Sequence, residues 1–179
     1  LCDELGKVQT SLQDLSDNEE HSSDGYFEAI LSQAPYLEAV IKETLRRYPP
    51  VTAVGRICAI DGYQLGGIEL FKGQLVFVPT FAFHLNPDYY PDPYRFDPDR
   101  FMPENRDKLV PDTFMPFSLG PRNCVGMRFA YQELKLCLAQ LVTKYRFETT
   151  DKTPAELSFK KGSGLLTAQT FKLWIFQRQ

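Results

Sequence analysis

The apolar positions in the first half of the chain predict one amphipathic helix over residues 35–48. Pro35 suits the first helical turn, and the helix is expected to end before Pro49-Pro50 because a residue that precedes proline avoids helical geometry. Between these limits, apolar residues recur at the three- and four-residue spacing of one helical face. They are Leu37, Val40, Ile41, Leu45 and Tyr48.

The second half of the chain holds a longer helical pattern, over about residues 125–145. Its apolar positions predict one buried stripe, and its basic residues are expected on the solvated side of the helix. The predicted stripe consists of Ala130, Leu134, Cys137, Leu138, Leu141 and Val142, and the basic residues are Arg128, Lys135 and Lys144.

Short strands are predicted between and after these helices. Residues 51–60 and 74–79 indicate strands, separated by glycine-containing turns. Residues 157–161 and 170–177 alternate apolar and polar positions like the two strands of a hairpin. The remaining predictions are helical pieces at 1–15 and 26–31, an acidic loop at 16–25 and an irregular segment at 91–103. The expected fold is therefore mainly α with small β-sheets, an α+β class.

Charge and composition narrow the function. The 179-residue chain has a net charge of −3, but residues 1–25 carry seven acids against one lysine, so the rest of the chain sums to +3. This balance argues against nucleic acid as a partner and leaves room for a mildly basic docking face. Four cysteines without Cys-x-x-Cys spacing indicate reduced thiols, and two histidines are too few for a His-rich metal site. The longest apolar run is interrupted by Pro79 and is too short to span a bilayer.

One cysteine lies where a thiolate would be stabilised. Cys124 stands in a Gly- and Pro-containing loop directly before the long helical pattern, so its sulfur is near the positive end of a helix dipole. Arg122 adds a full positive charge. Gly120 and Gly126 allow a tight turn or the close approach of a flat cofactor, and Phe117 supplies an aromatic ring beside the sulfur. The alternative is a buried structural thiol.

These residues form the pattern Phe-x-x-Gly-x-Arg-x-Cys-x-Gly, which resembles the haem-binding signature of the cytochrome P-450 superfamily, closest to its animal microsomal branch of drug-metabolising and thromboxane synthase-like enzymes. The resemblance implies that Cys124 is the catalytic and metal ligand, holding haem b (iron protoporphyrin IX) by an axial thiolate. It also implies that residues 1–179 are the incomplete C-terminal part of a single domain of that fold, with the oxygen-activating half absent.

A second motif strengthens the resemblance. Glu43 and Arg46 stand three residues apart on one helix, a spacing that by itself is typical of a surface ion pair. In the resembled family, such a pair binds an arginine of a Phe-x-Pro-x-Arg-Phe element, which is present here with Arg100 as its arginine. The resemblance thus implies a structural network in which the Glu43 carboxylate lies between two guanidiniums. Arg47 is interpreted as a solvated residue.

Further contacts are implied for cofactor and substrate. Arg56 matches an arginine that bonds a haem propionate, with an exposed strand charge as the alternative. The cofactor-binding set is then Phe117, Gly120, Arg122, Cys124, Gly126 and Arg56. The substrate-pocket positions are Thr52, Ala53, Val54, Leu165 and Leu166, although packing under a hairpin explains the two leucines equally well. His84 is interpreted as a structural residue that is hydrogen-bonded in a turn.

The resemblance implies a haem-thiolate monooxygenase that inserts one oxygen atom from O₂ into an apolar organic substrate. The alternatives are a thiolate-haem isomerase or dehydratase of the same fold, or an inactive truncated product that acts at most as a binding module. An electron-donor protein, expected to be an NADPH-dependent flavoprotein reductase, is the implied partner. The implied location is the cytosolic face of the endoplasmic reticulum membrane, with anchoring only through an absent N-terminal part.

Overall fold

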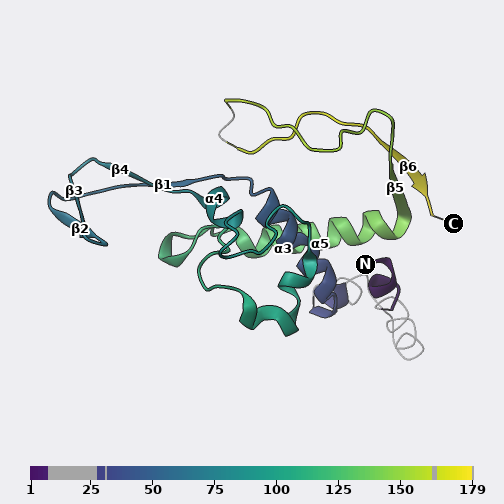
Figure 1. Cartoon of the computed structure of the whole chain (residues 1–179). Coiled ribbons are helices and arrows are strands. Elements are labelled where there is room, and N and C mark those ends of the chain that lie inside the picture. The colour runs from purple at the N-terminus through teal and green to yellow at the C-terminus, as the bar shows by residue number, and fades with distance from the viewer. Residues whose placement is uncertain (8–27, 31, 163–164, 179) are drawn as a thin grey trace.

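The computed structural model describes residues 1–7, 28–30, 32–162 and 165–178, in which two helices dominate (Figure 1). Helix α3 spans Pro35–Arg47 and helix α5 spans Met127–Lys144, close to both predicted ranges. The shorter helical elements are α4 (Thr80–His84) and the 3₁₀ turns η1 (Pro98–Phe101), η2 (Pro103–Lys108) and η3 (Gly120–Arg122). The strands are β1 (Val54–Ile57), β2 (Tyr63–Leu65), β3 (Ile68–Leu70), β4 (Leu75–Val78), β5 (Tyr145–Thr149) and β6 (Leu173–Gln177).

Helix α3 lies at the centre of the main apolar core. Its predicted stripe is buried, since Leu37, Ile41 and Leu45 are all less than a tenth exposed. Helix α5 closes one side of this core through Ala139. The N-terminus of α3 is capped from far along the chain, because the Glu4 carboxylate accepts hydrogen bonds from the backbone N–H groups of Tyr36 and Leu37 at 2.7 and 3.0 Å.

Three antiparallel pairs of strands surround the helices. Strand β1 pairs with β4, β2 with β3, and β5 with β6. The β2–β3 hairpin lies beyond the β1–β4 ribbon, away from the helices, whereas the β5–β6 pair extends from the C-terminal end of α5 (Figure 1). Helices together with small antiparallel sheets confirm the α+β class.

The predicted buried stripe of α5 is only partly right: Leu138 and Val142 pack against the core and Ala130 is half-buried, but the other three residues are exposed. Leu134 and Leu141 are 36% and 38% exposed, and Cys137 is also exposed. Lys135, which was expected in solvent, is instead 8% exposed. The reason is that α3 contacts the neighbouring face of α5, so burial follows the position of α3 rather than the apolar positions of α5.

The predicted C-terminal hairpin is also partly wrong. Strand β6 pairs with β5, directly after α5, and not with residues 157–161. Those residues make only an isolated bridge, between Phe159 and Ala168. Alternation marks a strand but does not say which strand it will pair with, because pairing depends on the course of the chain between them. The predicted helical pieces are present at residues 2–7 and 28–30, and the acidic loop at 16–25 lies outside the described residues.

Candidate functional site

The loop that carries Cys124 is held by its own backbone. The Cys124 N–H donates to the Phe117 carbonyl at 2.9 Å, which closes the loop, and Gly120 within it has a φ of +74°. This left-handed conformation favours glycine. The Cys124 carbonyl accepts a hydrogen bond from the Met127 N–H at 3.3 Å, and helix α5 begins at Met127. The cysteine therefore stands at the junction of loop and helix, as the sequence predicted.

Cys124 and the apolar side chains near it in the sequence are open to solvent. Cys124 itself is exposed, so it is not the buried structural thiol of the alternative interpretation. Val125 is fully exposed, and Leu119 and Phe129 are 41% and 70% exposed. The Phe117 ring packs against Tyr131 of α5, with 5.4 Å between the ring centroids. An accessible thiol among exposed apolar side chains is a surface that an apolar ligand with a soft metal would cover.

This surface fits the haem that the sequence implies. The donor is a thiol that can ligate iron as a thiolate, and the apolar residues around it can lie against a flat macrocycle. A Cβ atom built on Gly126 would lie 3.9 Å from the Cys124 sulfur, so a side chain there would stand close to the ligand atom. Arg122 is exposed in the same loop, where a propionate can reach it.

A second part of the candidate site is a buried polar centre on α3. Glu43 and Arg46 are both fully buried in α3 and form a bidentate pair, with N–O distances of 2.7 and 2.8 Å. Glu43 Oε1, which accepts one of these two bonds from Arg46, also accepts the Asp97 N–H at 2.8 Å. The Arg46 guanidinium also donates to the Pro93 and His84 carbonyls, both at 2.8 Å. One ion pair thus fastens α3 to two other segments of the backbone.

Arg100 joins this centre less closely. Its Nε lies 3.9 Å from Glu43 Oε1, which is an ion-pair distance but too long for a hydrogen bond. That Nε is buried and has no hydrogen-bond partner among the described residues, whereas Nη2 donates to the Asp92 carbonyl at 3.2 Å. The structure therefore brings Glu43, Arg46 and Arg100 together, and the Asp97 backbone occupies the place where a second bidentate arginine would donate.

His84 is a structural residue in this region, as its sequence position indicated. It is fully buried at the end of α4, and both ring nitrogens have backbone partners. Burial lowers the pKa of His84 to about 4, and the positive charge of Arg46 acts in the same direction. The imidazole is consequently neutral near pH 7.

The other predicted site residues are spread along the chain. Arg56 is exposed on β1, and its guanidinium donates to the neighbouring Gly55 carbonyl at 2.9 Å. No hydrogen bond or ion pair joins it to the Cys124 loop within the part of the chain that the structure describes. Arg47, which was expected to be solvated, is half-buried, and its guanidinium lies against the rings of Tyr48 and Tyr94.

The two groups of pocket residues lie near each other. Thr52, Ala53 and Val54 are half-buried at the start of the β1–β4 ribbon. The backbone N–H of Leu166 donates to the Pro50 carbonyl at 2.8 Å, which brings the 165–166 turn beside the chain leading to Thr52. Leu165 is 55% exposed.

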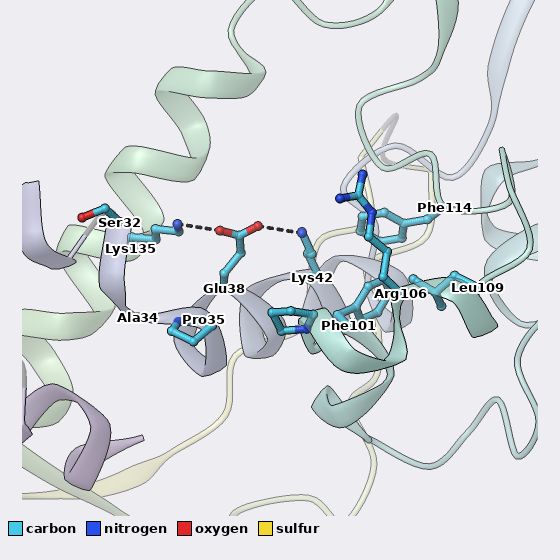
Figure 2. A pocket seen from close by; sticks show the side chains of 11 residues that line it. Ser32, Ala34, Pro35, Glu38, Lys42, Phe101, Arg106, Leu109, Phe114 and Lys135 are labelled. Carbon is cyan, nitrogen blue, oxygen red and sulfur yellow. Dashed lines mark hydrogen bonds and ion pairs between the residues drawn. The ribbon is translucent and has the colours of Figure 1, made fainter.

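A cavity of about 610 Å³ opens between α3, α5 and the 3₁₀ turns (Figure 2). Lys42 and Lys135 point at the Glu38 carboxylate from opposite sides, with N–O distances of 2.6 and 2.7 Å (Figure 2). Burial alone would raise the pKa of Glu38, but the hydrogen bonds and charges of Lys135 and Lys42 lower it below its usual value. Sequence analysis missed this link, although Glu38 and Lys42 stand at i and i+4 spacing.

Comparison with known proteins identifies relatives. The family model described as Cytochrome P-450 matches residues 8–175. The chain is 40% identical to cytochrome P-450 9e2 of Blattella germanica over 177 residues, which cover 96% of this chain and 33% of the relative. It is 38% identical to cytochrome P-450 3A9 of Rattus norvegicus over 163 residues, which cover 89% and 31%. The chain spans about a third of the length of these relatives.

Proposed function

The chain belongs to the cytochrome P-450 family, and we propose from this that residues 1–179 are the C-terminal part of a single haem-thiolate monooxygenase domain. Haem with an axial cysteine thiolate is the cofactor of this family. The observation that carries the proposal is the exposed Cys124, held by its backbone at the start of α5 among exposed apolar side chains.

The proposed reaction converts an apolar substrate R–H, one O₂, two electrons and two protons into R–OH and water. One oxygen atom enters the C–H bond and the other is reduced to water. Haem supplies the iron chemistry of oxygen activation, and the role of this chain is to hold it. Cys124 is the proposed axial ligand and is therefore the catalytic residue that the chain contributes.

The remaining residues of the site are assigned by their chemistry. Arg122 and Arg56 would bond the propionates, because a guanidinium matches a carboxylate in geometry and charge. Gly120 shapes the loop, Gly126 keeps the space beside the sulfur free of a side chain, and Phe117 packs the loop onto α5. The Glu43–Arg46–Arg100 centre is proposed as the structural support of this loop.

Substrate, partner and location are proposed at a coarser level. The apolar substrate would lie against Thr52, Ala53, Val54, Leu165 and Leu166. The two electrons would come from an electron-donor protein, an NADPH-dependent flavoprotein reductase. The proposed location is the cytosolic face of the endoplasmic reticulum membrane. Within the described ranges, no helix is long and apolar enough to cross a membrane.

The proposal is tested by loading the chain with haem, reducing it and adding carbon monoxide. Thiolate ligation shifts the Soret band of the ferrous carbonyl complex strongly to the red, so the wild-type chain should show this band. Cys124→Ser should abolish it, because a serine oxygen does not replace a thiolate. Cys137→Ser is the matched control, since Cys137 is another exposed free thiol, on α5.

Two results would contradict the proposal. One is a red-shifted band that survives Cys124→Ser, and the other is its loss in Cys137→Ser alone. In a polypeptide that contains the whole domain, Cys124→Ala should also abolish oxygen insertion, and insertion that persists would rule out the assigned ligand.

A further inference from the structure

His84 joins two segments that are far apart in the sequence. Its Nε2 accepts the backbone N–H of Met115 at 2.9 Å, across 31 residues. Its Nδ1 lies 3.2 Å from the Arg46 carbonyl, across 38 residues. The imidazole also stacks on Phe114, with 5.5 Å between the ring centroids and 21° between the planes. Both ring nitrogens therefore have a partner, and one face of the ring is covered by an aromatic side chain.

The two partners fix the proton on the ring. A backbone N–H can only donate, so Nε2 must carry a lone pair toward Met115. A carbonyl can only accept, so Nδ1 carries the proton and donates it to Arg46. The neutral imidazole satisfies both groups in a site that water does not reach. A protonated ring would instead present an N–H to the Met115 N–H.

The connection to Arg46 is made twice. The His84 side chain donates to the Arg46 carbonyl, while the Arg46 side chain donates to the His84 carbonyl at 2.8 Å. Arg46 is in turn the partner of Glu43. Movement of His84 would therefore disturb a fully buried polar centre.

Met115 is the root of the Cys124 loop. Its carbonyl accepts the Ser118 N–H at 3.0 Å, and the Phe117 carbonyl then accepts the Cys124 N–H at 2.9 Å. A continuous series of backbone contacts leads from His84 through Met115 and Phe117 to the cysteine. We propose that His84 is a positioning residue, whose neutral imidazole fastens the root of the Cys124 loop to the Glu43–Arg46 centre.

The consequence of this inference, the orientation of the thiolate, rests on the proposed function. The His84 link itself does not depend on haem. Its role is to hold the loop backbone, so that the sulfur meets its ligand from a fixed direction. The Asp97 N–H, which shares Glu43, completes the support from the other side.

Acid should release the link. The charged and titratable groups around His84 are Arg46 and Glu43 of α3, Arg100 of η1, and Tyr90, whose ring lies under Arg46. The packed segment 113–117 contributes no titratable side chain. The folded pKa of about 4 lies below the ordinary 6.5, so the loop should lose stability as the pH falls from 6.5 toward 4. The equilibrium constant for opening of the Cys124 loop should rise by as much as about a hundredfold between pH 6.5 and pH 4.

Two substitutions separate the two hydrogen bonds. In His84→Gln, the amide reaches the position of Nε2 and can accept from Met115. In His84→Asn, the shorter side chain stays near the position of Nδ1 and cannot reach Met115. Both variants remain uncharged at every pH and both lose the stacked ring, so they differ in side-chain length and in which of the two hydrogen bonds each can keep.

The measurement is hydrogen exchange of the chain at pH 7, without haem, followed by mass spectrometry. The peptide that spans residues 115–124 should exchange about tenfold faster in His84→Asn than in the wild-type chain, because a buried donor loses its acceptor. It should stay near the wild-type rate in His84→Gln. Peptides from the β5–β6 pair should not change in either variant.

Equal exchange in the two variants would overturn the inference, whether both match the wild-type chain or both lose protection. Loss of protection throughout the His84→Asn chain would overturn it too, because His84 would then support the fold rather than the loop.

A second experiment compares the hydrogen-exchange protection factors of this segment at pH 6.5 and pH 4. The wild-type segment should lose protection and His84→Gln should not, and parallel profiles would contradict release by His84.

Failure of the proposed function gives a different result. A chain that shows no thiolate-type carbonyl spectrum, but shows the exchange difference, would disprove the haem assignment and retain the His84 link. With haem bound, His84→Asn should reduce the fraction with the red-shifted Soret band and His84→Gln should preserve it.

Discussion

Helices α3 and α5 carry the same kind of sequence pattern, but the pattern predicts burial much better in α3 than in α5. In α3 the apolar stripe is buried, with Leu37 fully buried and Ile41 only 2% exposed. In α5 the apolar stripe is buried only in part: Leu138 and Val142 pack against the core, whereas Leu134 and Leu141 are 36% and 38% exposed. The face of α5 that is buried includes a lysine, Lys135 at 8% exposed. Periodicity identified the apolar face of each helix but identified the buried face of only one.

The difference lies in what surrounds each helix. Helix α3 contacts α4, α5 and η1, so segments pack around several of its sides. Helix α5 contacts mainly α3 and β5, and several apolar side chains of its outer face stay more than a third exposed. An apolar stripe on a helix becomes buried only where another part of the protein packs against it. The two helices should therefore respond very differently to similar substitutions.

The largest expected effect is that of a substitution at Glu43, which is fully buried in α3. Glu43→Gln removes the charge from a fully buried carboxylate and leaves the Arg46 guanidinium without its counter-ion. We expect the free energy of unfolding to fall by about 3–5 kcal/mol, measured by urea denaturation. Glu148→Gln is the control, because the Arg146–Glu148 pair is half exposed, and its effect should stay within about 0.5 kcal/mol. Equal losses in the two variants would show that the Glu43 centre is not buried in solution.

The next prediction compares the two apolar stripes directly. Leu37→Ala should cost about 2–5 kcal/mol, since it leaves a cavity in the α3 core. Leu134→Ala removes the same atoms from an open face and should cost less than about 1 kcal/mol. Urea denaturation of both variants in one buffer checks the difference. Similar losses at the two positions would mean that another surface covers α5 in solution, for example a second copy of the chain.

The smallest effect concerns the ion pair that joins the two helices. Glu38 of α3 accepts from Lys135 of α5 at 2.7 Å, and the Glu38 side chain is 37% exposed. A double-mutant cycle with Glu38→Gln and Lys135→Met should give a coupling of about 0.5–1 kcal/mol. The coupling should decrease as the pH falls below the ordinary Glu value of 4.5, because the pKa of Glu38 is lowered in the fold and its protonation removes the charge. A coupling that does not change down to pH 3 would contradict the pair.

Much of the fold was predictable because its signals are local. Prolines set the start and the end of α3, glycine-containing turns separated β1 to β4, and the cysteine loop preceded α5 as expected. The position of Cys124 in a loop directly before a helix was also predictable, since the residues that define the loop stand within ten positions of the sequence. The family assignment follows from the same motif and is confirmed by the family model.

The remainder could not be predicted, because it depends on segments that meet only in three dimensions. The spacing of Glu43 and Arg46 indicated an ion pair, yet nothing local showed that the Asp97 backbone would share Glu43 or that Arg100 would stay 3.9 Å away. The same holds for the pairing of β5 with β6, which a separation of more than twenty residues leaves open.

The sequence by itself determined the two long helices, which residue is the metal ligand to test and which family the chain belongs to, because these are encoded in neighbouring positions. Only the tertiary structure decided which face of α5 is buried, and that His84 links Arg46 to Met115 across 38 and 31 residues. A buried polar side chain needs hydrogen-bond partners. Packing in three dimensions, not distance along the sequence, decides which groups these partners are.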